Sequence, residues 1–132
     1  MANPSKQKGT AYETKIVEWL KSLGLNADRL TLSGKNDRGD VSVQEWPGVV
    51  IEAKNCQRME LAKWIDEAER ERSNVDGWLG VVWHHRPRNG LVGNDYVTMS
   101  GEDFTILMND WYNMKQALER IAELRATESE DV

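Results

Sequence analysis

Asp40-Val41-Ser42-Val43 is followed, after a short connection, by Val49-Val50-Ile51-Glu52-Ala53-Lys54, and this pairing indicates the fold class. Valines alternate with polar residues in the first segment, which is typical of a short β-strand. The second segment is apolar enough to lie inside a sheet. Trp46-Pro47-Gly48 favours a tight turn between them, because proline presets φ and glycine tolerates positive φ. The sequence therefore predicts a hairpin whose second strand is internal to a sheet.

The hairpin brings two acids together. If Val43 lies opposite Val49, the same register places Asp40 opposite Glu52, with Cβ atoms about 4.5–5.5 Å apart. Two carboxylates at that separation repel each other unless a proton or a cation lies between them. Their oxygen atoms suit a hard divalent ion such as Mg²⁺. Lys54 shares the face of Glu52, so it could contact an attacking water or a phosphate; an ordinary cross-strand ion-pair cluster is the alternative.

Further elements are expected on both sides of the hairpin. Apolar residues at helical or strand spacing predict a helix over Thr10–Leu23, an extended segment over Asn26–Leu32, a helix around Leu61–Ala68, a strand over Trp78–Trp83, a further candidate strand over Tyr96–Met99, and a long helix capped by Ser100. The order αβββαβα predicts an α/β fold in which helices flank a mixed β-sheet.

Glu13 is a further candidate site residue. On the first helix it shares a face with Val17 and Leu20, four and seven residues later, so its side chain should point toward the core. That placement fits an acid used at a site. The alternative is an acid near a helix N-terminus, which the helix dipole stabilises without any further role.

Length and composition point to one domain. The chain has 132 residues, 39% hydrophobic and 30% charged, as in a globular protein. We expect one domain over residues 1–125 and a flexible acidic tail over residues 126–132. The lone cysteine, Cys56, excludes an internal disulfide and fits a reducing compartment. No signal-peptide core or apolar span is evident, so we expect a cytoplasmic protein without a membrane partner.

Four segments of the sequence carry a resemblance to a known family. They are Gly9-Thr10-Ala11-Tyr12-Glu13, Arg29-Leu30-Thr31-Leu32-Ser33-Gly34, Asp37-Arg38-Gly39-Asp40-Val41 and Val50-Ile51-Glu52-Ala53-Lys54-Asn55. Together they resemble the PD-(D/E)xK nuclease superfamily, and within it the Holliday-junction resolvases of archaea and their phage-encoded relatives. The resemblance covers about residues 8–58 and is loose beyond them. Gly39 stands where proline often precedes the first acid, a departure that the group tolerates.

The resemblance implies a restriction-endonuclease-like core and a metal-dependent active site. Asp40, Glu52 and the backbone carbonyl of Ala53 would hold Mg²⁺, for which Mn²⁺ can substitute. Glu13 would hold a second ion or act through a water. Lys54 would orient the attacking water and stabilise charge at phosphorus. The implied reaction is in-line hydrolysis of a phosphodiester, in which the ion lowers the pKa of a water and neutralises charge.

DNA contacts are expected near this site. By resemblance, Ser33 would contact a phosphate, although turn chemistry with Gly34 explains the same residue. Gln57 could hydrogen-bond near the site or simply begin the next helix. Basic residues that could bind phosphates cluster around the site in the sequence: Lys6, Lys8, Lys15, Lys35, Arg38 and Arg58.

The net charge of −5 and a pI near 5.1 argue, taken alone, against a nucleic-acid partner. The charge is unevenly distributed, however. Residues 1–58 hold nine Lys or Arg and seven Asp or Glu, a balance of +2, whereas residues 59–132 hold eight and fifteen, a balance of −7. Three of the seven acids are expected to face metal ions. The part of the chain that bears the site is therefore compatible with DNA.

These observations predict a Mg²⁺-dependent DNA endonuclease, first of all a resolvase of four-way junctions that acts in recombination and repair. The alternatives are a nuclease for flaps or restriction-type duplex targets and a catalytically silent DNA-binding module. Symmetric cutting of two strands calls for a C2 homodimer. The apolar stripe of the last helix, with Trp111 and Met114, is a candidate interface, although packing on its own sheet would also use it. A bacterial or archaeal host cell, with a phage-encoded gene, fits this prediction.

Overall fold

A computed structural model of the chain describes residues 3–31 and 38–130. Contacts between Cα atoms divide it into a compact unit that ends at Ser100 and a second unit that begins at Gly101. The sequence had led us to expect one domain over residues 1–125.

The first unit is built on a mixed sheet of five strands in the order β1-β2-β3-β4-β5. The strands are β1 (Ala27–Arg29), β2 (Val41–Val43), β3 (Val49–Lys54), β4 (Leu79–His84) and β5 (Tyr96–Thr98), and a 3₁₀ turn, η1 (Val92–Asn94), precedes β5. The β3–β4 pair is parallel and the other pairs are antiparallel. The predicted α/β class with a mixed sheet is thus confirmed, and β3 is internal, as its apolar sequence indicated.

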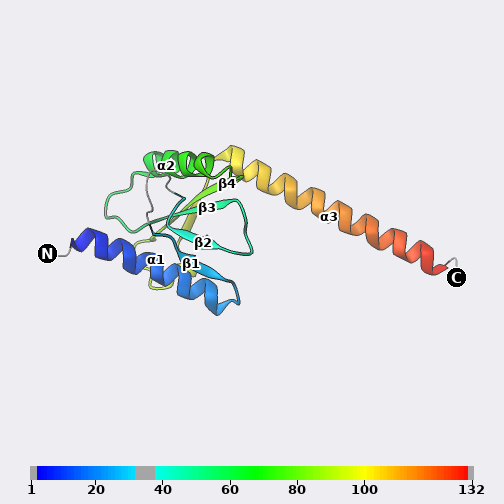
Figure 1. Cartoon of the computed structure of the whole chain (residues 1–132), viewed down its shortest axis with the longest axis horizontal. Coiled ribbons are helices and arrows are strands. Elements are labelled where there is room, and N and C mark those ends of the chain that lie inside the picture. The colour runs from blue at the N-terminus through cyan, green and yellow to red at the C-terminus, as the bar shows by residue number, and fades with distance from the viewer. Residues whose placement is uncertain (1–2, 32–37, 131–132) are drawn as a thin grey trace. The chain divides into compact units, whose positions relative to one another are not determined.

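Two helices, α1 (Pro4–Ser22) and α2 (Leu61–Asn74), pack on the sheet, which lies between them in Figure 1. Ile16 and Leu20 of α1 join a buried cluster that includes Ile51 of β3. Trp64 and Ala68 of α2 form a separate cluster with Val82 of β4. Because neighbouring residues of a strand point to opposite faces, the two clusters show that α1 and α2 cover opposite faces of the sheet.

The first helix begins at Pro4, six residues before the start that we expected at Thr10. The side chain of Asn3 accepts a hydrogen bond from the backbone N–H of Ser5 at 3.0 Å, and Pro4 occupies the first turn. Both are favourable helix-start features. The hydrophobic pattern missed them because the residues from Pro4 to Lys8 are polar and exposed.

The β2–β3 register is the one that the sequence predicted. Val41 pairs with Ile51, and Asp40 is the residue directly before β2. The backbone N–H of Asp40 donates to the carbonyl of Ile51 at 2.9 Å. Gly39 has a φ of +97°, and a Cβ there would lie 3.0 Å from the same carbonyl oxygen. Glycine precedes Asp40 because neither a side chain nor the φ of proline fits this close approach.

The second unit is a single helix, α3 (Gly101–Glu130), of 30 residues. It begins directly after Ser100, as expected. Residues 126–130, which we expected to belong to a flexible acidic tail, continue the helix. Ala126 and the glutamates after it have good helix propensity, and Thr127 donates to the carbonyl of Glu123 at 3.0 Å. In residues 3–31 and 38–130, no helix combines the length and apolarity needed to cross a bilayer.

Asp95 ties α1 to the connection between β4 and β5. Its side chain is only 1% exposed. One carboxylate oxygen accepts the hydroxyl of Tyr12 at 2.7 Å, and the other accepts the backbone N–H of Arg86 at 3.0 Å and the amide of Asn89 at 2.8 Å. Burial acts to raise the pKa of Asp95, but these hydrogen bonds, together with His85, outweigh it and lower the pKa.

We expect Asp95→Asn to lower the free energy of unfolding by about 2 kcal/mol at pH 7, because charge-assisted hydrogen bonds are lost. The folded-state pKa of Asp95 is lowered, so its contribution is present above the ordinary aspartate value of about 3.9 and is lost as pH falls below it. Urea unfolding at pH 7 and pH 3 measures the difference, with Asp66→Asn, an exposed acid on α2, as control. An equal loss at both pH values would contradict this assignment.

Candidate active site

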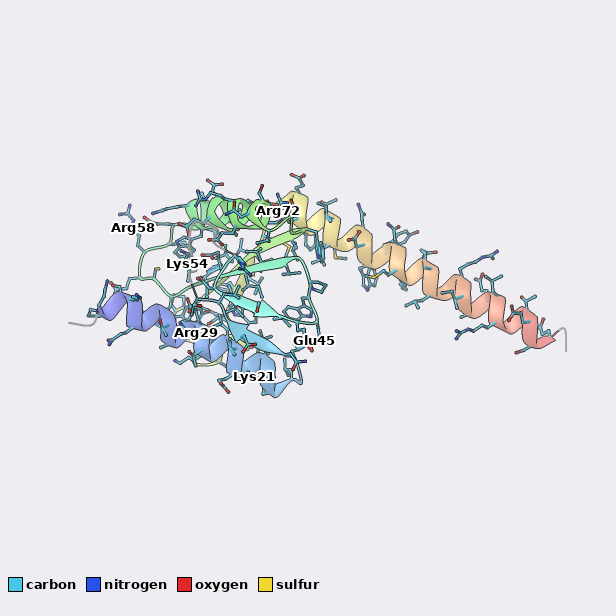
Figure 2. The ribbon with its side chains drawn as sticks, in the orientation of Figure 1. Lys21, Arg29, Glu45, Lys54, Arg58 and Arg72 are labelled. Carbon is cyan, nitrogen blue, oxygen red and sulfur yellow. The ribbon has the colours of Figure 1, made fainter. Side chains whose placement is uncertain are left out.

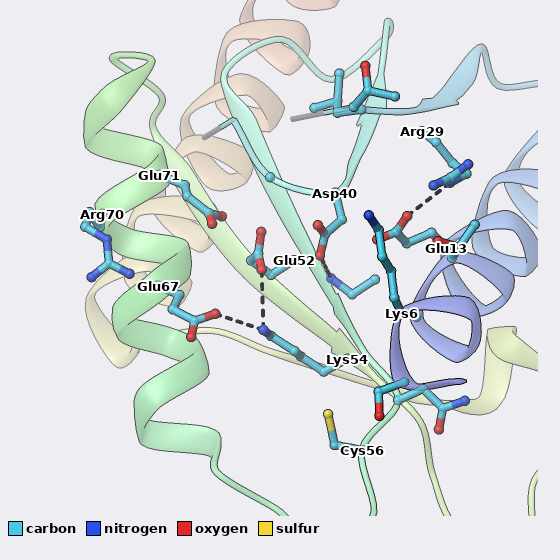
Figure 3. A pocket seen from close by; sticks show the side chains of 18 residues that line it. Lys6, Glu13, Arg29, Asp40, Glu52, Lys54, Cys56, Glu67, Arg70 and Glu71 are labelled. Carbon is cyan, nitrogen blue, oxygen red and sulfur yellow. Dashed lines mark hydrogen bonds and ion pairs between the residues drawn. The ribbon is translucent and has the colours of Figure 1, made fainter. Parts of the chain in front are cut away.

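A cavity of about 670 Å³ lies at the end of β3, where α1 and α2 both contribute to its wall. Figure 3 shows the side chains that point into it. The described lining residues are Ser5, Lys6, Gly9, Thr10, Glu13, Arg29, Leu30, Thr31, Gly39, Asp40, Glu52, Ala53, Lys54, Asn55, Cys56, Glu67, Arg70 and Glu71. All four residues predicted as catalytic, Glu13, Asp40, Glu52 and Lys54, therefore meet at one cavity.

Asp40 and Glu52 face each other across the two strands, as Figure 3 shows. Asp40 is held by the backbone N–H of Ala53, which donates to its Oδ2 at 2.9 Å. Glu52 is only 4% exposed, and its Oε1 has no hydrogen-bond partner among the described residues. A buried acceptor without a partner costs about 1–3 kcal/mol. Beside the Asp40 carboxylate, which Ala53 holds, Glu52 thus presents a buried oxygen atom that lacks a hydrogen-bond partner among the described residues.

Glu71 of α2 is a site residue that the sequence reasoning missed. It is 5% exposed and its carboxyl group hydrogen-bonds that of Glu52. Burial, then this hydrogen bond, then the charge of Asp40 raise the pKa of Glu52 strongly. Two carboxyl groups can hydrogen-bond only when one of them carries a proton. At neutral pH the Glu52–Glu71 pair therefore shares a proton.

A signal for Glu71 was present in the sequence. Trp64, Ala68 and Glu71 follow one another at intervals of four and three residues, so Glu71 lies on the buried stripe of α2. An acid on an apolar stripe is costly unless something pairs with it. That spacing could have identified Glu71 as a residue facing the sheet.

Lys54 lies between two carboxylates. Its ammonium is 2.8 Å from Glu67 Oε2 and 3.8 Å from Glu52 Oε2. Burial acts to lower the pKa of Lys54, but the hydrogen bond to Glu67 and the charges of the surrounding acids outweigh it, and the pKa is raised. Lys54 consequently stays charged. Glu67, on α2, was also missed from the sequence.

Glu13 projects from α1 into the cavity, as its helical position predicted. Its Oε2 accepts a hydrogen bond from Arg29 Nε of β1 at 3.0 Å. Burial raises the pKa of Glu13, Arg29 acts to lower it and the charge of Asp40 acts to raise it, with a raised pKa as the result. Glu13 is therefore coupled electrostatically to Asp40, although it comes from a different element.

The predicted DNA contacts are less well placed. Ser33 and Lys35 lie outside the described residues. Lys8, Arg38, Gln57 and Arg58 are exposed, and none of these four lines the cavity. Figure 2 shows Arg58 projecting away from Lys54. The basic residues that do line the cavity are Lys6, Arg29, Lys54 and Arg70.

The two consecutive histidines lie outside the cavity wall. His84 is buried, and its Nε2 lies 2.8 Å from Thr98 Oγ1. Burial outweighs the charge of Asp95 and lowers the pKa of His84, so it is a neutral core residue. His85 contacts Asp95. His84 is the last residue of β4, and His85 begins the connection that follows it.

Among the described residues, the cavity wall carries five acids and four bases, so it can bind a cation through carboxylates and an anion through the bases. Within residues 3–31 and 38–130, no three His, Cys, Asp or Glu side chains are arranged as a ready-made metal site. Mg²⁺ commonly takes only one or two protein carboxylates and keeps several waters. The Asp40–Glu52 pair meets that smaller requirement.

Comparisons with known proteins add no family to this geometry. No protein-family model, curated protein or solved structure matches the chain. What the site can do chemically follows from its opposed acids, its charged lysine and its surrounding bases.

Because Glu52 holds a proton in the folded, metal-free protein, we expect the free energy of unfolding to depend on pH. A carboxyl group whose pKa is raised on folding stabilises the protein below the ordinary value, about 4.3, and loses that contribution as pH rises. In EDTA, we expect the free energy of unfolding to fall from pH 5.5 to pH 8, by at most about 1.4 kcal/mol per pH unit for one group.

Glu52→Gln should flatten this dependence and stabilise the metal-free protein at pH 8, because the side chain at position 52 no longer has to take up a proton when the chain folds. Urea unfolding midpoints over the same pH range give the measurement. Glu123→Gln, which removes an exposed acid from α3, is the matched control and should keep the wild-type slope. An unchanged slope in Glu52→Gln would show that the shared proton does not control stability.

Proposed function

We propose that the protein is a Mg²⁺-dependent DNA endonuclease of the PD-(D/E)xK type, with a restriction-endonuclease-like core, and that it resolves four-way DNA junctions. One observation carries the nuclease proposal: Asp40, Glu52 and Lys54 line a single cavity, and the charges of Asp40 and Lys54 both act on Glu52. Their sequence order is that of the motif, and Glu13 reaches the same cavity from α1. An ordinary surface ion-pair cluster would not leave a carboxylate oxygen buried without a partner.

The residues present fit the proposed metal. Glu52 Oε1 is buried and lacks a partner among the described residues, and Asp40 lies opposite. Both supply the hard oxygen ligands that Mg²⁺ and Mn²⁺ accept. Asp40, Glu52 and the carbonyl of Ala53 would hold the ion, and Glu13 would hold a second ion or a water. Because ligating carboxylates must be ionised, Glu52 would give up its shared proton on binding.

The chain's own groups can then perform phosphodiester hydrolysis. The bound ion would lower the pKa of a water and neutralise negative charge. Lys54, which stays charged, can orient the attacking water and donate hydrogen bonds to the phosphate oxygen where charge develops. Glu67 positions the Lys54 ammonium at 2.8 Å. Lys6, Arg29 and Arg70 can bind neighbouring phosphates.

The preference for four-way junctions rests on the resemblance of residues 8–58. The positive balance of that part of the chain supports DNA as the substrate. Cutting two strands of a junction symmetrically takes two active sites, and therefore two copies of the chain related by a two-fold axis. The contacts expected from Ser33, Lys35 and Gln57 remain predictions.

A panel of DNA structures tests this proposal. Four-way junction, flap, linear duplex and single strand are incubated with the protein in Mg²⁺ or EDTA, and we expect the junction to be cut first and only with Mg²⁺. Asp40→Asn and Glu52→Gln should each lower the cutting rate by at least about a thousandfold, because the ion loses a ligand. Both should keep junction binding. Glu18→Gln, an exposed acid on α1, should cut like wild type.

Other results of the same DNA panel would distinguish the alternative functions from one another. Faster cutting of flaps or duplex would identify a nuclease for another target. Binding without cutting, in either Mg²⁺ or Mn²⁺, would favour the silent DNA-binding module. Cutting that is unchanged in EDTA would exclude the metal mechanism, and full activity in Asp40→Asn would remove Asp40 from the site.

Mg²⁺ should also stabilise the folded protein. At a free concentration ten times the dissociation constant, a single site adds about 1.4 kcal/mol to the free energy of unfolding. Thermal unfolding with increasing MgCl₂ measures this effect, with KCl at matched ionic strength as control. Asp40→Asn and Glu52→Gln should lose the Mg²⁺-specific shift. A shift that persists in both variants would place Mg²⁺ elsewhere on the protein.

A further inference from the structure

Apolar residues recur along α3 at alternating intervals of three and four. They are Phe104, Leu107, Trp111, Met114, Leu118 and Ile121. This is the spacing of the a and d positions of a heptad repeat, in which Phe104 is an a position and Leu107 a d position. Five of the six, all except Leu107, are between 46% and 67% exposed. The helix thus presents a continuous apolar seam, which we call the α3 seam.

The opposite side of α3 is polar. The f positions, which point away from an a/d seam, are Asn109, Gln116, Glu123 and Glu130. The α3 seam extends over about 26 Å at 1.5 Å per residue. An exposed apolar surface of that length, with a polar reverse side, is typical of a helix that pairs with another helix.

Charges beside the seam indicate which helix fits. Asp110 is a g position and Lys115 is the e position five residues later. In a parallel pair of α3 helices, the g position of one copy faces the e position of the other. Asp110 of each copy therefore faces Lys115 of the other copy, which gives two equivalent contacts. In an antiparallel pair, g faces g and e faces e, and these charges do not meet. The remaining flanking residues of the central heptads, Ala117 and Ala122, permit close approach.

The position of Lys115 supports this arrangement. Its ammonium lies 5.3 Å from the ring centroid of Trp111, an a-position residue. The aliphatic stem of Lys115 therefore runs along the margin of the seam, where side chains at e positions cover the core of a coiled coil.

We infer that α3 pairs with α3 of a second copy of this chain in a parallel, two-stranded coiled coil. Since the chain enters α3 from Ser100, a parallel pair joins the two units that precede it at the same end of the coil. Two cavities would then belong to one two-fold symmetric particle. The inference depends on α3 alone and stands or falls separately from the nuclease proposal.

Sedimentation equilibrium of the full chain tests the pairing. We expect a mass twice that of the 15.1 kDa chain, with dissociation on dilution. Leu118→Lys should raise the dissociation constant at least about a hundredfold, because a charge replaces an apolar seam residue in both copies. Gln116→Lys makes the same change of charge on the polar side and should stay within about threefold of wild type.

Three results would overturn the inference. They are a monomeric wild-type chain at micromolar concentration, a mass greater than two chains, and equal dimerisation of Leu118→Lys and Gln116→Lys. Wild-type self-association needs no variant, so the conclusion does not depend on how Leu118→Lys folds.

A charge exchange tests the parallel direction. Asp110→Lys and Lys115→Asp are exposed changes that place like charges across a parallel pair, and each alone should raise the dissociation constant about tenfold. An equimolar mixture restores opposite charges at both contacts and should associate within about threefold of wild type. A mixture that associates no more tightly than either variant alone would exclude the parallel pair.

Discussion

The burial of Glu52 beside Asp40 is the constraint on which the site depends, because burial first, and then the hydrogen bond with Glu71 and the charge of Asp40, raise the pKa of Glu52. The register of β2 and β3 cannot shift by one residue, because such a shift would turn every side chain of the strand to the other face of the sheet. Glu71 shares a proton with Glu52, and Lys54 lies within 3.8 Å of it. The shared proton and the Lys54 ammonium each reduce the net negative charge of these buried acids.

Holding these acids together costs stability, which the apolar packing offsets. Residues of α1 and α2 bury opposite faces of the sheet in two clusters. The same two helices also deliver Glu13, Glu67 and Glu71 to the cavity wall. Packing and site formation are therefore linked: a helix that docks its apolar stripe also places its acids. A function that needs opposed carboxylates fits a fold in which they are held against their own repulsion.

Local sequence patterns predicted the helices, the strands and the hairpin well. They failed where an element begins or ends with polar residues, and where a side chain's position depends on packing between elements. The alternation of β2, the turn at Trp46-Pro47-Gly48 and the apolar β3 were sufficient to predict the register. The start of α1 was missed because capping residues lie outside the hydrophobic pattern, and residues 126–130 were judged by charge instead of helix propensity. Glu71 was missed because its direction depends on which face α2 packs.

Short-range rules are enough for features that neighbouring residues create: the opposed Asp40 and Glu52, the placement of Lys54 and the apolar seam of α3 all follow from periods of two and three-and-a-half residues. Other features arise only when the chain folds. They are the parallel β3–β4 pairing, the contact of Lys54 with Glu67, the proton shared by Glu52 and Glu71, and the Arg29–Glu13 ion pair. They join segments from different elements, and no local pattern specifies such distances. Docking of α1 and α2 on the sheet creates them.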